Sequence, residues 1–435
     1  MTTLELPAGV QEAARLTAGL DRVVMQGFSR FDPKDPGLVE LGDALAVSPL
    51  GTSFRDAVAA LGRGELLAHH LATLAAARAG VEGARFDALA QVAAAALGVE
   101  LVDVDEGPAS PPDPAARALL DGAQQWLLEI ALSGLGQLEL AAVAPAVAGL
   151  RNLQEHPQLG RVAALLTGFV HELLDAVPTS GIAEPPTRRW VDLWSRALLS
   201  TVVLPGVPAE RRVSGTFTPL GADLRHHEHL LACVVHGLLQ VGGDDAPHLV
   251  RTTISAWRVD AIAGEEVWAL LRATAPELID ALGKPRTFAL DGAMLRATGD
   301  LVWPAKVAVG KGASPTTTSL AGARWTKPAP RDRHPLQLAI PLVGDRGRLD
   351  ALASAGAALD MSGVSPYAAL TEADVRAADG VVGLLRFDDG FFVQPLAATK
   401  GKSLLGPAGP IAASAKINKP VLGVLRERAS KLLRA

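Results

Sequence analysis

The sequence predicts an α+β fold: a mainly helical N-terminal half followed by a mostly antiparallel β-containing C-terminal half with interspersed helices. Apolar residues recur at helical spacing through the first 200 positions. Near position 205 the pattern changes to alternating runs that are rich in β-branched and aromatic residues. Helices and strands that are segregated in this way favour an α+β arrangement over a doubly wound α/β sheet.

The composition is that of a chain with a sizeable core and no strong overall charge. Of the 435 residues, 49% are hydrophobic, 20% are charged and 4% are aromatic. These values exclude an intrinsically disordered chain and predict a core packed mainly by Ala, Leu and Val. The net charge of −5 excludes a global electrostatic attraction to nucleic acid or to acidic membranes.

Helices are expected throughout the first half. Apolar spacing predicts helices over residues 10–24, 54–79 and 86–97, with stops at Gly80 and Gly98. The same spacing predicts further helices over residues 115–132, 138–150, 160–177 and 188–203.

Strands, turns and shorter helices are expected in the second half. Two pairs, Asp291-Gly292 and Asp389-Gly390, stand between strand-like runs and predict hairpins, because Asp-Gly tolerates the positive φ angles of a type I′ turn. Residues 305–333, rich in Gly, Pro, Thr and Ser, are expected to form a long loop. Strands are further predicted over residues 213–219, 250–262 and 334–343, and helices over 264–282, 348–358, 371–378 and 420–433.

These elements predict a division of the chain into five parts. The parts are an N-terminal helical domain over residues 1–104, a Pro-rich linker over 105–114, a second helical segment over 115–204, an α+β domain with the two Asp-Gly hairpins over 205–398, and a basic C-terminal tail or helix over 399–435. The proposed linker, DEGPASPPDP, is acidic, rich in proline and without periodicity.

Histidines cluster between residues 223 and 236, together with the single cysteine of the chain. If this segment is helical, His229, Cys233 and His236 fall on one stripe at spacing i, i+4, i+7. Imidazole and thiolate are the usual zinc ligands, and three of them leave one coordination position for water. We therefore expect either a divalent-metal site here or a packed segment in which Cys233 serves as a small hydrophobe.

Other catalytic motifs are incomplete. His171 and Glu172 begin an HExxH-like pattern, but Asp175 stands where that motif needs its second histidine. The Gly-Lys-Gly sequence at residues 310–312 lacks the spacing of a phosphate-binding loop, and no GxSxG pattern occurs. The sequence therefore assigns neither a nucleotide hydrolase nor an α/β-hydrolase.

Basic residues gather in the C-terminal tail and in the loop over residues 305–334. The tail from residue 399 onward carries eight Lys and Arg against one acid. With a loop tryptophan on which a base would stack, these cations form a candidate binding patch for RNA, a nucleic-acid single strand or an anionic protein. Its members are Lys311, Trp325, Lys327, Lys400, Lys402, Lys416, Lys419, Arg426 and Arg428. The alternative is a solvated tail whose cations stabilise the end of a helix.

Together these features predict a non-enzymatic binding or scaffold subunit of a cytoplasmic multi-protein assembly, with another protein as its partner. The single cysteine excludes an intrachain disulfide and fits a reducing compartment. No secretory signal is recognised, and no apolar run is long and clean enough for a membrane span. Two alternatives stay open: a metal-dependent enzyme that uses the His226–His236 cluster, and a nucleic-acid-associated protein that uses the basic tail and the 305–334 loop.

Overall fold

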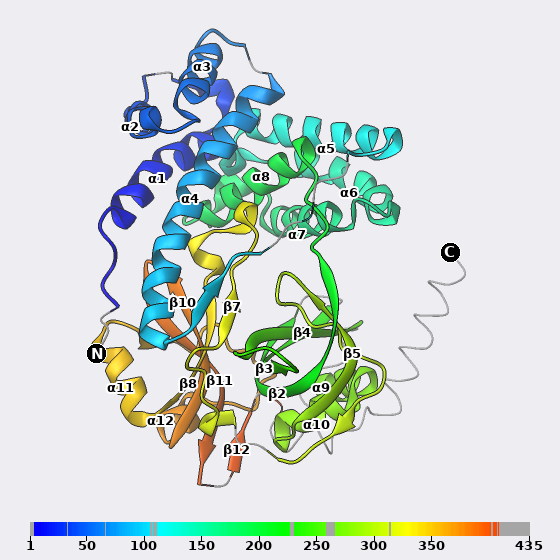
Figure 1. Cartoon of the computed structure of the whole chain (residues 1–435). Coiled ribbons are helices and arrows are strands. Elements are labelled where there is room, and N and C mark those ends of the chain that lie inside the picture. The colour runs from blue at the N-terminus through cyan, green and yellow to red at the C-terminus, as the bar shows by residue number, and fades with distance from the viewer. Residues whose placement is uncertain are drawn as a thin grey trace.

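The computed structural model places a helical half above a sheet half (Figure 1). It describes residues 4–32, 34–65, 67–104, 107, 111–226, 230–257, 266–312, 315–401, 403–406 and 408. The long helix α4 (Ala68–Leu97) runs from the helical half down to the sheets (Figure 1). A helical first half followed by a second half of mostly antiparallel sheets with helices confirms the predicted α+β class.

The helical half follows the predicted periodicity. Besides α4 it contains α1 (Val10–Gln26), α2 (Pro36–Ala44), α3 (Gly51–Gly62), α5 (Pro114–Ser133), α6 (Leu140–Glu155), α7 (Gly160–Ala176) and α8 (Thr187–Val202). Local chemistry fixes the start of α5: the Asp113 carboxylate accepts a hydrogen bond from the Ala116 amide, and Pro114 occupies the first helical position.

The predicted helix over residues 54–79 is wrong in its boundaries. The chain forms two helices there, because α3 ends at Gly62 and α4 then continues through Gly80. One interior glycine costs a helix only about 1 kcal/mol, which the buried apolar residues of α4 offset. Gly98, at φ 70°, ends α4 as predicted.

Two sheets make up the lower half of the molecule. The seven-stranded sheet has the order β1-β7-β4-β3-β2-β5-β6, in which β1 and β7 pair in parallel and the strands from β4 to β6 are antiparallel. In the five-stranded sheet β12, β11, β10 and β8 are antiparallel, and β9 joins β11 in parallel. The strands are β1 (Glu100–Val102), β2 (Glu210–His226), β3 (Leu230–Val241), β4 (His248–Trp257), β5 (Phe288–Arg296), β6 (Ala308–Val309), β7 (Arg324–Thr326), β8 (Ala339–Asp345), β9 (Ala358–Leu359), β10 (Gly380–Asp388), β11 (Gly390–Lys400) and β12 (Ser403–Leu405).

The two Asp-Gly pairs have different structures. Asp389, at φ 58°, reverses the chain between β10 and β11, which confirms that hairpin. The hairpin predicted at Asp291-Gly292 is wrong, because both residues lie inside β5 opposite the single residue Ser214 of β2. This is a β-bulge: Gly292 has φ 61°, and Ser214 bonds both the Asp291 carboxylate and the Gly292 amide at 3.0 Å.

The remaining predicted elements are mostly present with shifted ends. Residues 266–283 form two helices rather than one, and the loop over residues 305–333 contains only short strands and 3₁₀ turns. The helices of this half are α9 (Glu266–Thr274), α10 (Pro276–Gly283), α11 (Arg346–Ser354) and α12 (Glu372–Arg376). The helix predicted over residues 420–433 lies outside the described residues. Among the described helices, none is long and apolar enough to cross a membrane.

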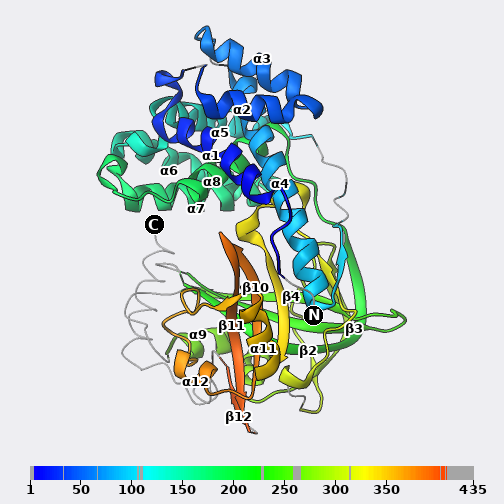
Figure 2. The ribbon, with the colours of Figure 1, turned by 90° about the vertical axis from the view of Figure 1, so that its left-hand side faces the viewer.

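Helix α4 belongs to two hydrophobic cores. Leu71 and Leu74 in its first half pack in the core of the helical bundle. Phe86 and Leu89 in its second half pack in a core with the sheets, beside which α4 descends in Figure 2. Strand β1, which follows α4, then pairs with β7. Residues 1–104 thus contribute to both halves, and the five-part division stays a prediction.

Candidate functional site

The predicted metal ligands do not share a helical face. The segment around Cys233 and His236 is strand β3, so the helical stripe proposed for them is wrong. Residues three apart on a strand point to opposite faces. Cys233 is fully buried in the core beneath the seven-stranded sheet, and burial raises the pKa of its thiol well above the usual range. The third expected ligand, His229, lies outside the described residues.

His236 lies on the opposite face of β3 from Cys233, the face on which Leu238 packs against the core that contains the five-stranded sheet. It is only 7% exposed, and its Nε2 atom has no hydrogen-bond partner among the described residues. Burial, followed by the nearby Arg251 guanidinium, lowers the pKa of this imidazole to about 3. His236 is therefore neutral at pH 7, in a position that disfavours its protonation.

A polar cluster, here called the sheet junction, lies where the two sheets meet. It consists of Asp223 and Arg225 on β2, His236 on β3, Arg386 on β10 and Gln394 on β11. The Gln394 amide donates to Asp223 Oδ1 at 3.3 Å, and Arg225 Nε donates to Asp223 Oδ2 at 3.0 Å. Arg386 Nη1 donates to Gln394 Oε1 at 2.7 Å, and burial lowers the pKa of Arg386. The Gln394–Asp223 hydrogen bond thus joins one sheet to the other, and the other two bonds hold its two ends in place.

A small cavity adjoins the sheet junction. Asp223, Ser365 and Gln394 are among its lining residues, and its volume of about 10 Å³ leaves room for about one water molecule. Ser365 Oγ lies 3.3 Å from His226 Nδ1, and the His226 ring stands edge-on to Tyr367 with 5.1 Å between centroids. A hydroxyl beside an imidazole is the pair that nucleophilic catalysis needs, but substrate pockets usually measure at least about 300 Å³. This geometry therefore supports a packing role.

The candidate basic patch is only partly at the surface. Trp325 is buried and stacks on Phe86, with 6.4 Å between ring centroids, so it offers no face to a nucleic-acid base. Lys327 is also buried, with Nζ 3.2 Å from Asp87 and 3.0 Å from Asp103. The ion pair with Lys327 lowers the pKa of Asp103. These two side chains therefore fasten the 305–334 loop to α4 and the chain after β1.

The other members of that patch divide into two groups. Lys311 and Lys400 are exposed. Outside the described residues lie Lys402, Lys416, Lys419, Arg426 and Arg428.

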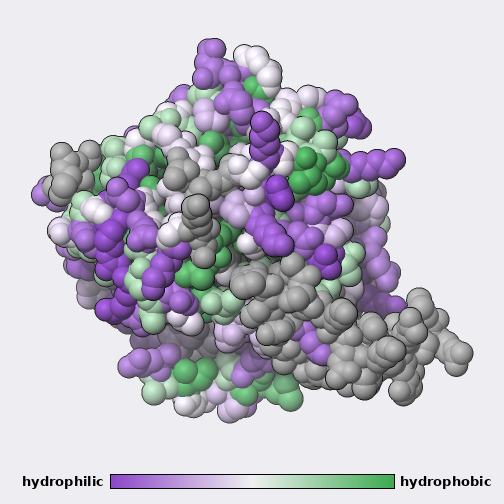
Figure 3. Space-filling view, turned by 90° about the horizontal axis from the view of Figure 1, so that it is seen from below, coloured by the Kyte–Doolittle hydropathy of each residue, from purple (hydrophilic) through white to green (hydrophobic). Residues whose placement is uncertain are grey.

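On the face of the molecule seen in Figure 3, hydrophobic residues gather in small groups among hydrophilic ones.

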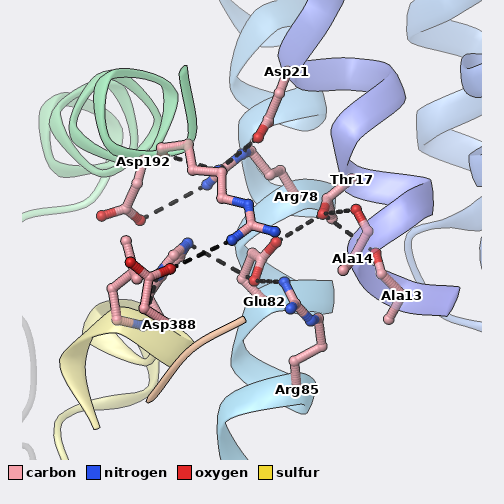
Figure 4. A network of polar contacts seen from close by, with 12 residues as sticks. Ala13, Ala14, Thr17, Asp21, Arg78, Glu82, Arg85, Asp192 and Asp388 are labelled. Atoms are coloured by element: carbon pink, nitrogen blue, oxygen red, sulfur yellow. Dashed lines mark hydrogen bonds and ion pairs between the residues drawn. The ribbon is translucent and has the colours of Figure 1, made fainter. Parts of the chain in front are cut away.

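A buried ion network in the helical half was not predicted. The α4 network consists of Asp21 on α1, Arg78, Glu82 and Arg85 on α4, and Asp192 on α8 (Figure 4). Arg78 Nε lies 2.5 Å from Asp21 Oδ1, and Arg85 Nη1 lies 2.6 Å from Glu82 Oε2. Burial raises the pKa of Asp21. The spacing of residues 78, 82 and 85 along one helical face could have predicted this network. Charged residues in the buried part of an Ala-rich helix need oppositely charged partners.

One helix presents an uncharged surface to solvent. The α6 outer face consists of the exposed residues Leu140, Ala141, Ala144, Val147 and Ala148. Leu140 is 57% exposed and Val147 is 45% exposed, and no charged residue occurs between positions 140 and 150. The opposite side of α6 packs on α5 and α7 through Val143, Leu150 and Leu153. The helix is therefore apolar all round over its first ten residues.

Comparisons with known proteins identify no relative: no family model, curated protein or solved structure matches the chain. Within the part of the chain that the structure describes, no group of three His, Cys, Asp or Glu side chains is arranged to hold a metal ion. Of the features described above, the α6 outer face points to a function, whereas the sheet junction holds the two sheets together.

Proposed function

We propose that the protein is a non-enzymatic binding subunit of a cytoplasmic multi-protein assembly, and that a partner protein docks on the α6 outer face. The observation that carries this proposal is the exposure of Leu140 and Val147, two turns apart on one uncharged helix surface. Removing apolar surface from water is favourable by roughly 25 cal/mol per Å². Contiguous exposed apolar surface is typical of interaction sites.

The polar clusters favour a binding role over catalysis. At the sheet junction, Asp223, Arg386 and Gln394 are engaged in hydrogen bonds or charge pairs within the chain. In the α4 network, Arg78 and Arg85 are paired with carboxylates and are almost fully buried. A catalytic group has to reach a substrate, and buried, mutually paired side chains of this kind instead hold secondary structure elements together.

A site-specific photo-crosslinker tests the docking surface directly. We would place the crosslinking residue at Ala144, in the middle of the α6 outer face, and at the exposed Ala59 on α3 as the reference position. In cells that express the full chain, we expect irradiation to give one discrete protein adduct from position 144 and none of that mass from position 59.

A matched pair of substitutions makes the result specific. Val147→Asp puts a charge into the α6 outer face, whereas Val39→Asp does the same on α2 at a similar exposed fraction, 49% against 45%. The adduct from position 144 should disappear with Val147→Asp and persist with Val39→Asp. Equal adducts from positions 144 and 59, or an adduct that survives Val147→Asp, would contradict the proposal.

A further inference from the structure

The exposed side of α6 carries a seam of regularly spaced residues, and Pro145 lies inside the helix beside it. Leu140, Ala144, Val147 and Arg151 follow one another at spacings of four, three and four residues, which keeps them on one helical stripe. All four are exposed. Ala144 in the middle of the seam would let another helix approach closely, while Leu140 and Val147 on either side provide apolar surface.

The two ends of this seam carry opposite charges. Glu139 immediately precedes α6 and is exposed. Arg151 is 84% exposed, and its Nε atom lies 3.3 Å from the exposed Glu155 carboxylate. An exposed pair of this kind contributes little to stability, so the guanidinium is available to a second acid. An acid at the start of the seam and a base at its end suit an antiparallel copy of the same seam.

From this pattern we infer that the occupant of the α6 outer face is a second copy of this chain, with the two α6 helices antiparallel about a twofold axis. Positions whose numbers sum to 291 then face each other: Leu140 faces Arg151 of the other copy, and Ala144 faces Val147. The stem of each Arg151 covers a Leu140, and its guanidinium reaches the adjacent Glu139. The inference rests on the proposed function, because it names the partner of the same surface.

In a twofold dimer each contact between the two seams occurs twice, once in each direction. In an isologous dimer the same patch meets itself, so both Glu139–Arg151 pairs form together. A helix of 16 residues is about 24 Å long, and one such contact buries less area than a large permanent interface. We therefore expect a reversible dimer with a dissociation constant on the order of micromolar.

Sedimentation equilibrium of the purified full chain over a hundredfold concentration range tests the dimer. We expect the weight-average mass to rise from 45.0 kDa toward twice that value. Val147→Asp should stay at the monomer mass throughout, and Val39→Asp should dimerise as the parent does. Melting temperatures of both variants would show that Val147→Asp is folded.

Charge exchange identifies the register. Glu139→Arg and Arg151→Glu should each weaken dimerisation at least tenfold when studied alone, because positions 139 and 151 of the two copies then carry like charges within reach of each other. An equimolar mixture of the two variants restores both opposite-charge contacts, and so does the double variant. Both should recover dimerisation to within about threefold of the parent.

Each outcome has a definite consequence. A parent that stays monomeric at every concentration overturns the second-copy inference, while a crosslink from Ala144 to a different protein would still support the proposed function. A dimer that persists in Val147→Asp overturns the use of this face. If the single charge variants weaken the dimer but their mixture does not recover it, the antiparallel register is wrong.

Discussion

At the scale of single residues, His236 makes the stability of the fold depend on pH. Its folded pKa of about 3 lies below the ordinary value of 6.5, so the unfolded chain binds a proton over this interval that the folded chain does not. The contribution of the neutral His236 imidazole to the free energy of unfolding is therefore fully present above pH 6.5, and it is lost as the pH falls toward 3. Between pH 7 and pH 5 this single group should cost about 2 kcal/mol of unfolding free energy.

Urea unfolding at the two pH values measures that loss. In His236→Gln, which cannot take up the proton, the decrease between pH 7 and pH 5 should be smaller than in the parent by about that amount. His69→Gln, at an exposed position of α4, serves as the control and should keep the full decrease. An unchanged pH dependence in His236→Gln would show that the imidazole is not held neutral at the sheet junction.

The roles of His236 and Cys233 could not be predicted because their segment fits two periodicities. Between residues 230 and 239 the apolar residues come in pairs, Leu230-Leu231, Val234-Val235 and Leu238-Leu239. Such pairs fit one face of a helix, and they fit equally well a strand that is buried on both sides. Only the pairing of β3 between β2 and β4 decides between them. The packed alternative, with Cys233 as a small hydrophobe, agrees with the core position of that residue.

At the scale of elements, the two Asp-Gly pairs show what local sequence leaves undecided. Each pair places one residue at positive φ, whereas the predicted type I′ turn needs two, so the dipeptide indicates the unusual backbone conformation but not the turn type. The partner strand decides what that conformation does. Residues on both sides of Asp291-Gly292 pair with the 17-residue strand β2, so the pair becomes a bulge. At Asp389 the flanking strands pair with each other, so the chain turns. The dipeptide contains no information about its partner strand.

Alanine substitution at the bulge would measure the free-energy cost of positive φ at Gly292. A Cβ atom added at Gly292 or at Gly122 in α5 would meet nothing within 4 Å, so packing does not differ between the two sites. Gly292 has φ 61°, whereas Gly122 is helical. Gly292→Ala should therefore destabilise the protein by about 1 kcal/mol, and Gly122→Ala should stabilise it by about 0.5–1 kcal/mol.

Chemical denaturation of both glycine variants, followed by far-ultraviolet circular dichroism, provides the comparison. Opposite signs are the expected result. If Gly292→Ala were neutral, the positive φ at the bulge would not be required for pairing between β2 and β5.

At the scale of the whole molecule, the helical half was largely predictable, whereas its surfaces were not. The run LAAVAPAVAG at residues 140–149 is apolar all round, a pattern typical of a buried helix. Its helical state is predicted correctly, but the sequence does not show that α6 lies at the edge of the bundle with one side open. The same limit applies to α4, whose two ends look alike in sequence although they pack in different cores.

Because α4 is shared between two cores, the two halves of the molecule should unfold together. Leu71 is buried in the helical core, and Phe86 is buried against the sheets. Truncating either side chain to alanine should cost about 2–5 kcal/mol. If α4 couples the two halves, either substitution lowers the unfolding midpoint of both halves. If the halves fold separately, each substitution lowers the midpoint only of the half whose core it alters.

Two probes report on the halves separately. Circular dichroism at 222 nm follows mainly the helices, and labelling of the single, fully buried Cys233 follows the opening of the sheet core. In the parent the two transitions should coincide, and Leu71→Ala and Phe86→Ala should shift both probes by equal amounts. Loss of helix in Leu71→Ala at denaturant concentrations that still protect Cys233 would mean that α4 does not couple the halves. The helical half, which carries the α6 outer face, would then fold independently of the two sheets.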